Sequence, residues 1–241
     1  MIELRILGGL DLSGVDANAA RELLAQPRPT ALLVYLVLAR PGQFHRRDHL
    51  VGLFWAESDQ EHARSNLRKL IHVLRHHLGD DLIEARGDED LRIAPSRVRC
   101  DAVECEEAIQ KQHYARALEL YSGALLPGFI LTGAPGLKSW LELARRNLTR
   151  DATKAAVSIA QLYLNDAELT KAGDVLRLIT RIEPELDDEH QLRKLLKLLD
   201  RLDDRAAAIR LYEDFKERVW RDFHVLPSPE TRSVIEAIRA R

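Results

Sequence analysis

The clearest periodic pattern of apolar and polar positions lies between His62 and Gly79, where apolar residues recur every three or four positions and predict an amphipathic helix. At about 100° per residue, one face of this helix is apolar and the opposite arc is cationic. Acidic residues at 57–61 precede it, where their charges favour the positive end of the helix dipole, and Gly79 is a suitable C-terminal cap. The apolar face consists of Ala63, Leu67, Leu70, Ile71, Leu74 and Leu78.

The residues before this helix predict two further helices. Pro27 and Pro29 mark a helix start, and the mostly apolar run 30–39 predicts a helix that is buried on most sides. After the turn at Pro41-Gly42, a second helix is expected over 46–55. Its inward-facing residues are expected to be Leu50, Leu53 and Phe54.

Short strands are expected on both sides of these three helices. Residues 2–12 alternate around Gly8-Gly9 and predict two strands joined by a tight turn, and 20–24 is interpreted as a third strand of that sheet. After the long helix, residues 81–94 have apolar pairs on both sides of Gly87, which predicts a β-hairpin. Three helices followed by a hairpin is the pattern of a winged helix, whose third helix enters the major groove of DNA.

The remainder of the chain has helical periodicity throughout. A shift of 35 positions between the segments 162–176 and 197–211 superposes Ala172 on Ala207, and Ala206 and Ala208 are also small. A period of about 34 with small residues at helix contacts is typical of tetratricopeptide-like helix pairs. Helices are expected at 101–111, 114–122, 137–164, 168–182, 187–200, 204–223 and 228–240.

We therefore expect a mainly α protein with two domains, divided near Pro95 and Ser96. Residues 1–97 are expected to form a winged helix-turn-helix with a small β-sheet and a hairpin wing. Residues 98–241 are expected to form an all-α tetratricopeptide-like array. The longest non-helical stretch, 123–136, is expected to be an ordered loop packed on this array.

Composition and charge narrow the functional classes. A chain of 241 residues with 46% hydrophobic residues is long enough for two cores, and its net charge of -2 requires any nucleic-acid contact to come from local clustering. Cys100 and Cys105 are too few for a disulfide framework. No secretion signal opens the sequence and no apolar run reaches the ~18 residues of a membrane span, so a cytoplasmic protein without a membrane partner is expected.

Catalytic and metal-binding patterns are weak. The phosphate-binding, dinucleotide-binding and hydrolase motifs GxxxxGK[ST], GxGxxG and GxSxG do not occur, so we expect no enzyme activity, no catalytic residue and no cofactor. His72 and His76, like His45 and His49, are one helical turn apart, which is a spacing found in metal sites. Neither pair has an obvious third ligand, and no metal is expected.

The cationic arc of the helix 62–78 is the candidate DNA-binding surface, because it lacks the acidic partners that an ordinary solvated helix carries. The alternative is a solvated helix with a chance run of bases. Arg64, Arg68 and Arg75 lie nearest each other on the arc and are the candidates for bidentate contacts with guanine. The expected DNA-binding residues are Arg64, Ser65, Arg68, Lys69, His72, Arg75 and His76, with Arg86 and Arg92 of the hairpin.

Two parts of the sequence resemble a known family. Residues 29–79, which include PRPTALLVYLVLARPGQFHRRDHLVGLFW and HARSNLRKLIHVLRHHLG, resemble the OmpR-like winged-helix domain of bacterial transcriptional activators of the SARP group. The C-terminal half resembles their bacterial transcriptional activation domain, particularly 206–239 with its LY…F…LPSPET…I pattern. The resemblance implies a DNA-binding regulator whose helical domain serves oligomerisation or signal input.

The sequence departs from the family pattern at two places. Val73 stands where the family usually has an Arg, two residues before Arg75, so one expected DNA contact is missing. The hairpin tip reads Gly87, Asp88, Glu89, Asp90, and three carboxylates there would repel phosphate. Either the tip points away from DNA and leaves Arg86 and Arg92 to touch it, or the affinity is below the family norm.

The resulting hypothesis is a sequence-specific regulator of transcription, an activator by resemblance, that binds double-stranded DNA. Its helical domain is expected to form a homodimer or to contact RNA polymerase. The alternative is a tetratricopeptide-like protein-interaction or ligand-sensing module with the N-terminal domain as a scaffold.

Overall fold

The computed structural model describes residues 1–182 and 188–240, which form a mainly helical protein with two small sheets. The expected fold class is confirmed: a winged helix is followed by a helical array. The domain boundary between residues 97 and 98 stays a prediction, and the compact units of the structure divide at other positions. One unit consists of Met1–Lys111 and Glu119–Leu148, and the other of Gln112–Leu118 and Thr149–Arg241.

The first sheet is formed by strands that lie before the first helix and by a strand that follows the hairpin. Strand β1 (Ile2–Arg5) pairs antiparallel with β2 (Asp11–Ser13), which confirms the two strands expected around Gly8-Gly9. Strand β6 (Val98–Cys100) pairs parallel with the other side of β1, giving the order β2-β1-β6. The chain therefore returns to its first strand before the C-terminal helices begin.

The third strand expected at 20–24 is wrong, because these residues belong to helix α1 (Ala17–Leu24). The carboxylate of Asp16 caps this helix by accepting hydrogen bonds from two backbone amides of its first turn, both at 3.0 Å. Ala20 and Leu23 are its buried residues, and their three-residue spacing is helical. A five-residue window is too short to show that period.

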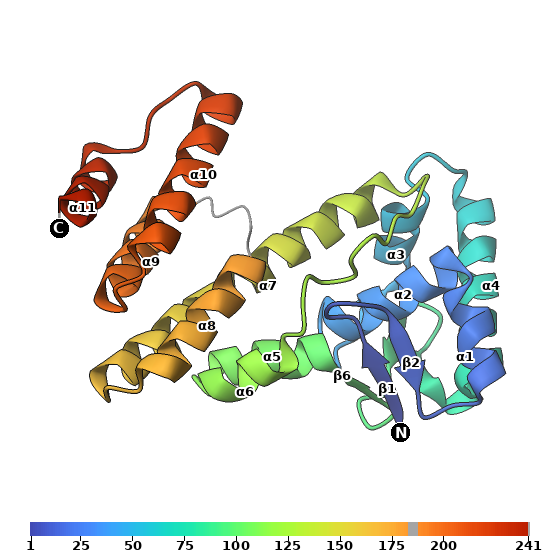
Figure 1. The fold of residues 1–241 in the computed structure, drawn as a ribbon. Coiled ribbons are helices and arrows are strands. Elements are labelled where there is room, and N and C mark those ends of the chain that lie inside the picture. The colour runs from blue at the N-terminus through green and yellow to red at the C-terminus, as the bar shows by residue number, and fades with distance from the viewer. Residues whose placement is uncertain (183–187, 241) are drawn as a thin grey trace. The chain divides into compact units, whose positions relative to one another are not determined.

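Helices α2 (Pro27–Leu38), α3 (Arg47–Phe54) and α4 (Gln60–Leu78) match the three expected helices to within a few residues. Figure 1 shows them in blue and cyan beside α1, and α4 packs against each of the other three. Most side chains of α2 are buried, as its apolar run predicts. The apolar residues expected to face inward on α3 are buried or half-buried: Leu50, Leu53 and Phe54.

The wing is a three-stranded sheet. Strands β4 (Ile83–Arg86) and β5 (Asp90–Ile93) form the expected antiparallel hairpin, which follows a 3-10 turn at Asp80–Leu82. Strand β3 (His45–Arg46), just before α3, adds to the other edge of β5. A strand of two residues has no periodicity, so the sequence did not predict it.

The loop over residues 123–136 packs on the helical array as expected, because Arg145 of α7 (Pro135–Asn165) donates hydrogen bonds to the carbonyls of Leu125 at 2.9 Å and Phe129 at 3.4 Å. It also pairs with the first strand, which the sequence did not predict. In the first unit, Gly8 donates its amide proton to the carbonyl of Ala124 at 2.9 Å, and Leu126 donates to the carbonyl of Ile6 at 2.7 Å. The loop therefore continues the backbone pairing beyond the end of β1. These bonds join segments far apart in the sequence, which local patterns cannot reveal.

The helices expected after residue 100 are confirmed, except that the first residue of the helix expected at 187–200 lies outside the described residues. They are helical at closely similar bounds because each has apolar residues at three- and four-residue spacing. The helices are α5 (Asp101–Gln110), α6 (Tyr114–Leu120), α7 (Pro135–Asn165), α8 (Leu169–Ile182), α9 (Glu189–Arg201), α10 (Arg205–Phe223) and α11 (Pro229–Arg239).

The buried residues of the second unit show the repeat seen in the sequence, but in a slightly different register. Ala172 on α8 is completely buried, and so is Ala208 on α10, whereas Ala207 is half-buried and Ala206 is exposed. By burial, Ala172 therefore corresponds to Ala208, one residue after the Ala207 on which the sequence superposes it. Small residues still mark the helix contacts, as expected for this type of repeat.

Candidate nucleic-acid interface

The start and end of α4 are fixed by side-chain and backbone caps. The carboxylate of Asp59 accepts hydrogen bonds from the amides of Glu61 at 3.1 Å and His62 at 3.3 Å. The His62 ring lies 3.1 Å from the same carboxylate and is the largest cause of the lowered pKa of Asp59. At the other end Gly79 has a φ of 105° and donates its amide to Arg75. These caps fix where α4 begins and ends.

The two faces of α4 differ in exposure as well as in chemistry. Ala63, Leu67 and Leu74 are at most 1% exposed, so this side is part of the core, and Leu70 is half-buried at its edge. On the opposite side the predicted DNA-binding residues are exposed or half-buried. The exposed ones are Arg64, Arg68, Lys69, His72 and His76, and the half-buried ones are Ser65 and Arg75.

Arg68 and Lys69 occupy the middle of the exposed arc. Within the described part of the chain, neither has an ion-pair or hydrogen-bond partner. The rings of His72 and His76 stack one turn further along, with their centroids 6.4 Å apart. The arc therefore presents cationic and hydrogen-bonding groups that no carboxylate of the helix neutralises.

A second group of arginines lies at the junction of α3, α4 and the wing. Arg64 is ion-paired with Asp48 at 2.7 Å, and Arg46 with Glu89 at 2.8 Å. These side chains border a cavity of about 460 Å³, which we call the arginine basin. The residues of the arginine basin are Arg46, Arg47, Asp48, Arg64, Leu67, Arg68, Asp88 and Glu89.

Arg75 has a different environment from Arg68. Its Nη2 donates a hydrogen bond of 2.9 Å to the carbonyl of Ile83, at the base of the wing. The side chain is half-buried and connects α4 to the hairpin. The contact with guanine that the sequence assigns to Arg75 stays a prediction, and the structure adds a structural role for this residue.

The two wing arginines lie over an aromatic ring that sequence reasoning missed. The guanidinium carbons of Arg86 and Arg92 are 4.7 Å and 4.5 Å from the centroid of the Phe44 ring. Arg92 is also ion-paired with Glu84 at 2.7 Å. Phe44 is a single aromatic residue in the loop before α3, and no local sequence pattern predicts its contact with the wing arginines. The ring limits the positions that both guanidinium groups can take.

The carboxylates at the tip of the wing are partly neutralised by these and neighbouring arginines. Asp90 is ion-paired with Arg86 at 2.6 Å, and Glu89 with Arg46. Asp88 has no such partner among the residues that the structure describes. The repulsion of phosphate expected from three carboxylates is therefore reduced at two of them.

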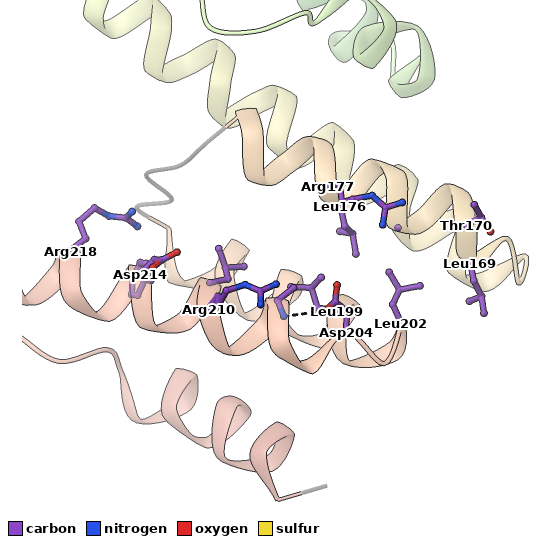
Figure 2. A pocket seen from close by; sticks show the side chains of 14 residues that line it. Leu169, Thr170, Leu176, Arg177, Leu199, Leu202, Asp204, Arg210, Asp214 and Arg218 are labelled. Carbon is purple, nitrogen blue, oxygen red and sulfur yellow. Dashed lines mark hydrogen bonds between the residues drawn. The ribbon is translucent and has the colours of Figure 1, made fainter.

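The second unit contains a separate groove of about 780 Å³ between α8 and the helices α9 and α10. Figure 2 shows Leu176 and Arg177 on one side of it, and Arg210, Asp214 and Arg218 along α10 on the other. Arg177 is ion-paired with Asp174 at 2.6 Å. The lining of the groove therefore combines apolar side chains with charges of both signs.

Three further findings concern metal binding, the cysteine thiols and membrane insertion. The described residues contain no group of three or more His, Cys, Asp or Glu side chains that could hold a metal ion. Burial raises the pKa of Cys100 and of Cys105 to about 12, so both thiols are protonated at neutral pH and poor nucleophiles. In the described ranges, none of the helices is long and apolar enough to cross a membrane.

Residues 89–239 match the model of a protein family described as "Bacterial transcriptional activator domain". The chain belongs to this family. The resemblance to SARP-type activators is therefore confirmed, and with it transcription regulation as the functional class of this family member. The family is one of regulators and not a class of enzymes.

Among solved structures, this bacterial transcriptional activator domain protein is similar to EmbR of Mycobacterium tuberculosis, determined in complex with a low-affinity phosphopeptide. The two chains are 19% identical, with a TM-score of 0.63 over 99% of this chain. The present chain spans 65% of the length of the EmbR chain, and at this identity the likeness shows the fold alone. No curated protein matches the sequence.

Proposed function

We propose that this family member is a sequence-specific transcription regulator that binds double-stranded DNA with α4 in the major groove. The observation that carries the proposal is the exposed arc of α4, where Arg68 and Lys69 have no ion-pair partner among the residues that the structure describes and lie opposite a buried apolar face. Membership of an activator family supports the same function. Activation is accordingly the proposed sign of regulation.

The proposed contacts follow from side-chain chemistry. Arg68 is the best candidate for a bidentate contact with guanine, because it is exposed and makes no ion pair among the described residues. Lys69 and His72 are suited to phosphates or bases, and Ser65, near the start of the helix, to a phosphate. The remaining proposed DNA contacts are Arg64, Arg75 and His76 on α4, and Arg86 and Arg92 on the wing.

The test is a binding measurement on a duplex selected from random or genomic DNA. With roughly 4–6 phosphate contacts, the logarithm of the binding constant should fall with the logarithm of salt concentration with a slope of about -4 to -5. Arg68→Ala should weaken binding about 5- to 150-fold if Arg68 reads a base. Arg232→Ala, which removes an exposed arginine from α11, is the matched control and should leave the affinity unchanged.

Wild-type binding that is insensitive to salt, or an equal effect of the two substitutions, would refute the role of α4.

We also propose that the helical unit makes a protein contact, either with a second copy of the chain or with RNA polymerase. Several large apolar side chains near the end of α10 support this proposal, because they are exposed to solvent and their burial against a partner favours association. The test is the oligomeric state and polymerase binding of Phe223→Ser compared with wild type. These side chains, each more than half exposed, are Trp220, Phe223, Val225 and Leu226.

The groove of Figure 2 favours a second candidate function, a protein-interaction or ligand-sensing module. In that case the N-terminal unit is a scaffold and does not bind DNA. The salt-dependent binding measurement distinguishes the two, because only the first function requires affinity for duplex DNA that depends on Arg68.

A further inference from the structure

The arginine basin contains acidic groups that have no evident role in DNA contact. Four arginines border it, and so do the three carboxylates of Asp48, Asp88 and Glu89. Two of these acids are ion-paired across the basin, Asp48 with Arg64 and Glu89 with Arg46. We infer that Asp48 and Glu89 occupy the positions of DNA phosphates in the unbound protein and so limit its sequence-independent affinity. The inference rests on the proposed DNA binding.

The geometry of both ion pairs is that of arginine with a phosphate oxygen. The Arg64 Nη2 to Asp48 Oδ1 distance is 2.7 Å, and the Arg46 Nη2 to Glu89 Oε2 distance is 2.8 Å, within the range of charge-assisted hydrogen bonds. The side chains of Asp48 and Glu89 are 60% and 75% exposed. Exposed pairs of this kind are weak, so a phosphate of the duplex can replace the carboxylate.

The side chain of Glu89 takes no part in the hydrogen bond that joins the wing to α3. It is the backbone carbonyl of Glu89 that accepts a hydrogen bond of 2.7 Å from the amide of Arg47 and so joins the wing to α3. The side chain lies at the tip of the wing, and among the described residues its only ion pair is with Arg46. Asp48 lies in the first turn of α3, where a carboxylate also interacts with the helix dipole.

The expected consequence is a defined change in salt dependence. In the wild-type protein a phosphate that binds Arg64 or Arg46 displaces a carboxylate, and the released carboxylate takes up a cation from solution, which offsets the counterion that the phosphate gives up. Removing one carboxylate should therefore release about one further counterion on binding and steepen the salt slope by about 0.9. At 0.1 M salt this corresponds to a gain in affinity of about 3- to 10-fold.

The experiment compares Asp48→Asn and Glu89→Gln with wild type on a selected duplex and on a scrambled duplex of the same length, over a range of salt concentrations. Both variants should bind both duplexes about 3- to 10-fold more tightly at 0.1 M salt, with a steeper slope. The ratio of the two affinities should stay constant, because phosphates are common to every sequence.

The matched control is Glu104→Gln. It removes the same charge from an ion pair of 2.7 Å with Arg99, a residue of β6 in the other sheet, and should change neither affinity nor slope. Asp48→Glu keeps the charge and should behave like wild type. If Asp48→Asn unfolds at a lower temperature than wild type, the DNA affinity of Glu89→Gln is the test of the inference.

Several outcomes would overturn the inference. If Asp48→Asn and Glu89→Gln bind DNA as Glu104→Gln does, the carboxylates do not compete with phosphate, while the loss caused by Arg68→Ala would still support the proposed function. If either variant loses affinity for the selected duplex alone, the carboxylate reads a base such as cytosine. If wild type binds no duplex at any salt concentration, the proposed function and the inference both fail.

Discussion

Replacing Arg75 with alanine should loosen the wing, whereas replacing Arg68 should not. Arg75 is half-buried and donates one hydrogen bond of 2.9 Å to the carbonyl of Ile83. A hydrogen bond from a charged group contributes about 1.5–3 kcal/mol, and partial exposure reduces this value, so we expect a loss of about 1–2 kcal/mol. Arg68 makes no such bond within the described residues, and its removal should change stability by less than about 0.5 kcal/mol.

The assay for this prediction is hydrogen exchange of the backbone amides in β4 and β5, which reports local opening of the hairpin. A loss of about 1–2 kcal/mol corresponds to exchange about 5- to 30-fold faster in Arg75→Ala than in wild type. Arg68→Ala is the matched control, because it removes the same group from the same helix. Equal exchange rates in the two variants would refute the structural role of Arg75.

Three further predictions concern stability. Burial raises the pKa of Glu189, but hydrogen bonds from Ser228 and Thr231 outweigh this effect, so the pKa is lowered. Glu189→Gln should therefore lower the free energy of unfolding by about 1–3 kcal/mol at pH 7, measured by urea unfolding. The difference from wild type should disappear as the pH falls from 4.5 through the folded-state pKa. The pKa of His45 is lowered from 6.5 mainly by burial, so the unfolded state binds more protons than the folded state. The stability of the wild type should therefore fall as the pH decreases below 6.5, and the melting temperature of His45→Gln should lack this part of the pH dependence. Gly8 has a φ of 73°, and an added Cβ would lie 2.9 Å from a backbone oxygen, so Gly8→Ala should lower stability by about 1–3 kcal/mol, and a melting temperature equal to that of wild type would contradict the observed turn.

Local patterns predicted the helices and the wing because the signals lie within one element. The apolar spacing of α4, the acidic residues before it and Gly79 after it all act over a few residues, and the structure shows the expected helix with its buried face. The hairpin around Gly87 was predicted for the same reason. In contrast, the strand predicted at 20–24 was wrong, because the helix there is capped by Asp16, which lies outside that segment.

The remaining features depend on contacts between distant parts of the sequence. The pairing of the loop after α6 with Ile6 and Gly8, and the contact of Phe44 with the wing arginines, have no local signature. The sequence likewise identified the basic residues of α4 but not which of them are held by other groups. Arg64 is held by Asp48 and Arg75 by the wing, and this separates them from Arg68.

The most direct test of the account is a methylation-interference experiment on the selected duplex. If α4 lies in the major groove, methylation of guanine N7 within the site should block binding of the wild-type protein, because N7 faces that groove. The interference at one guanine should disappear in Arg68→Ala. Interference only from adenine N3 in the minor groove, or none at all, would contradict the proposal that α4 reads DNA.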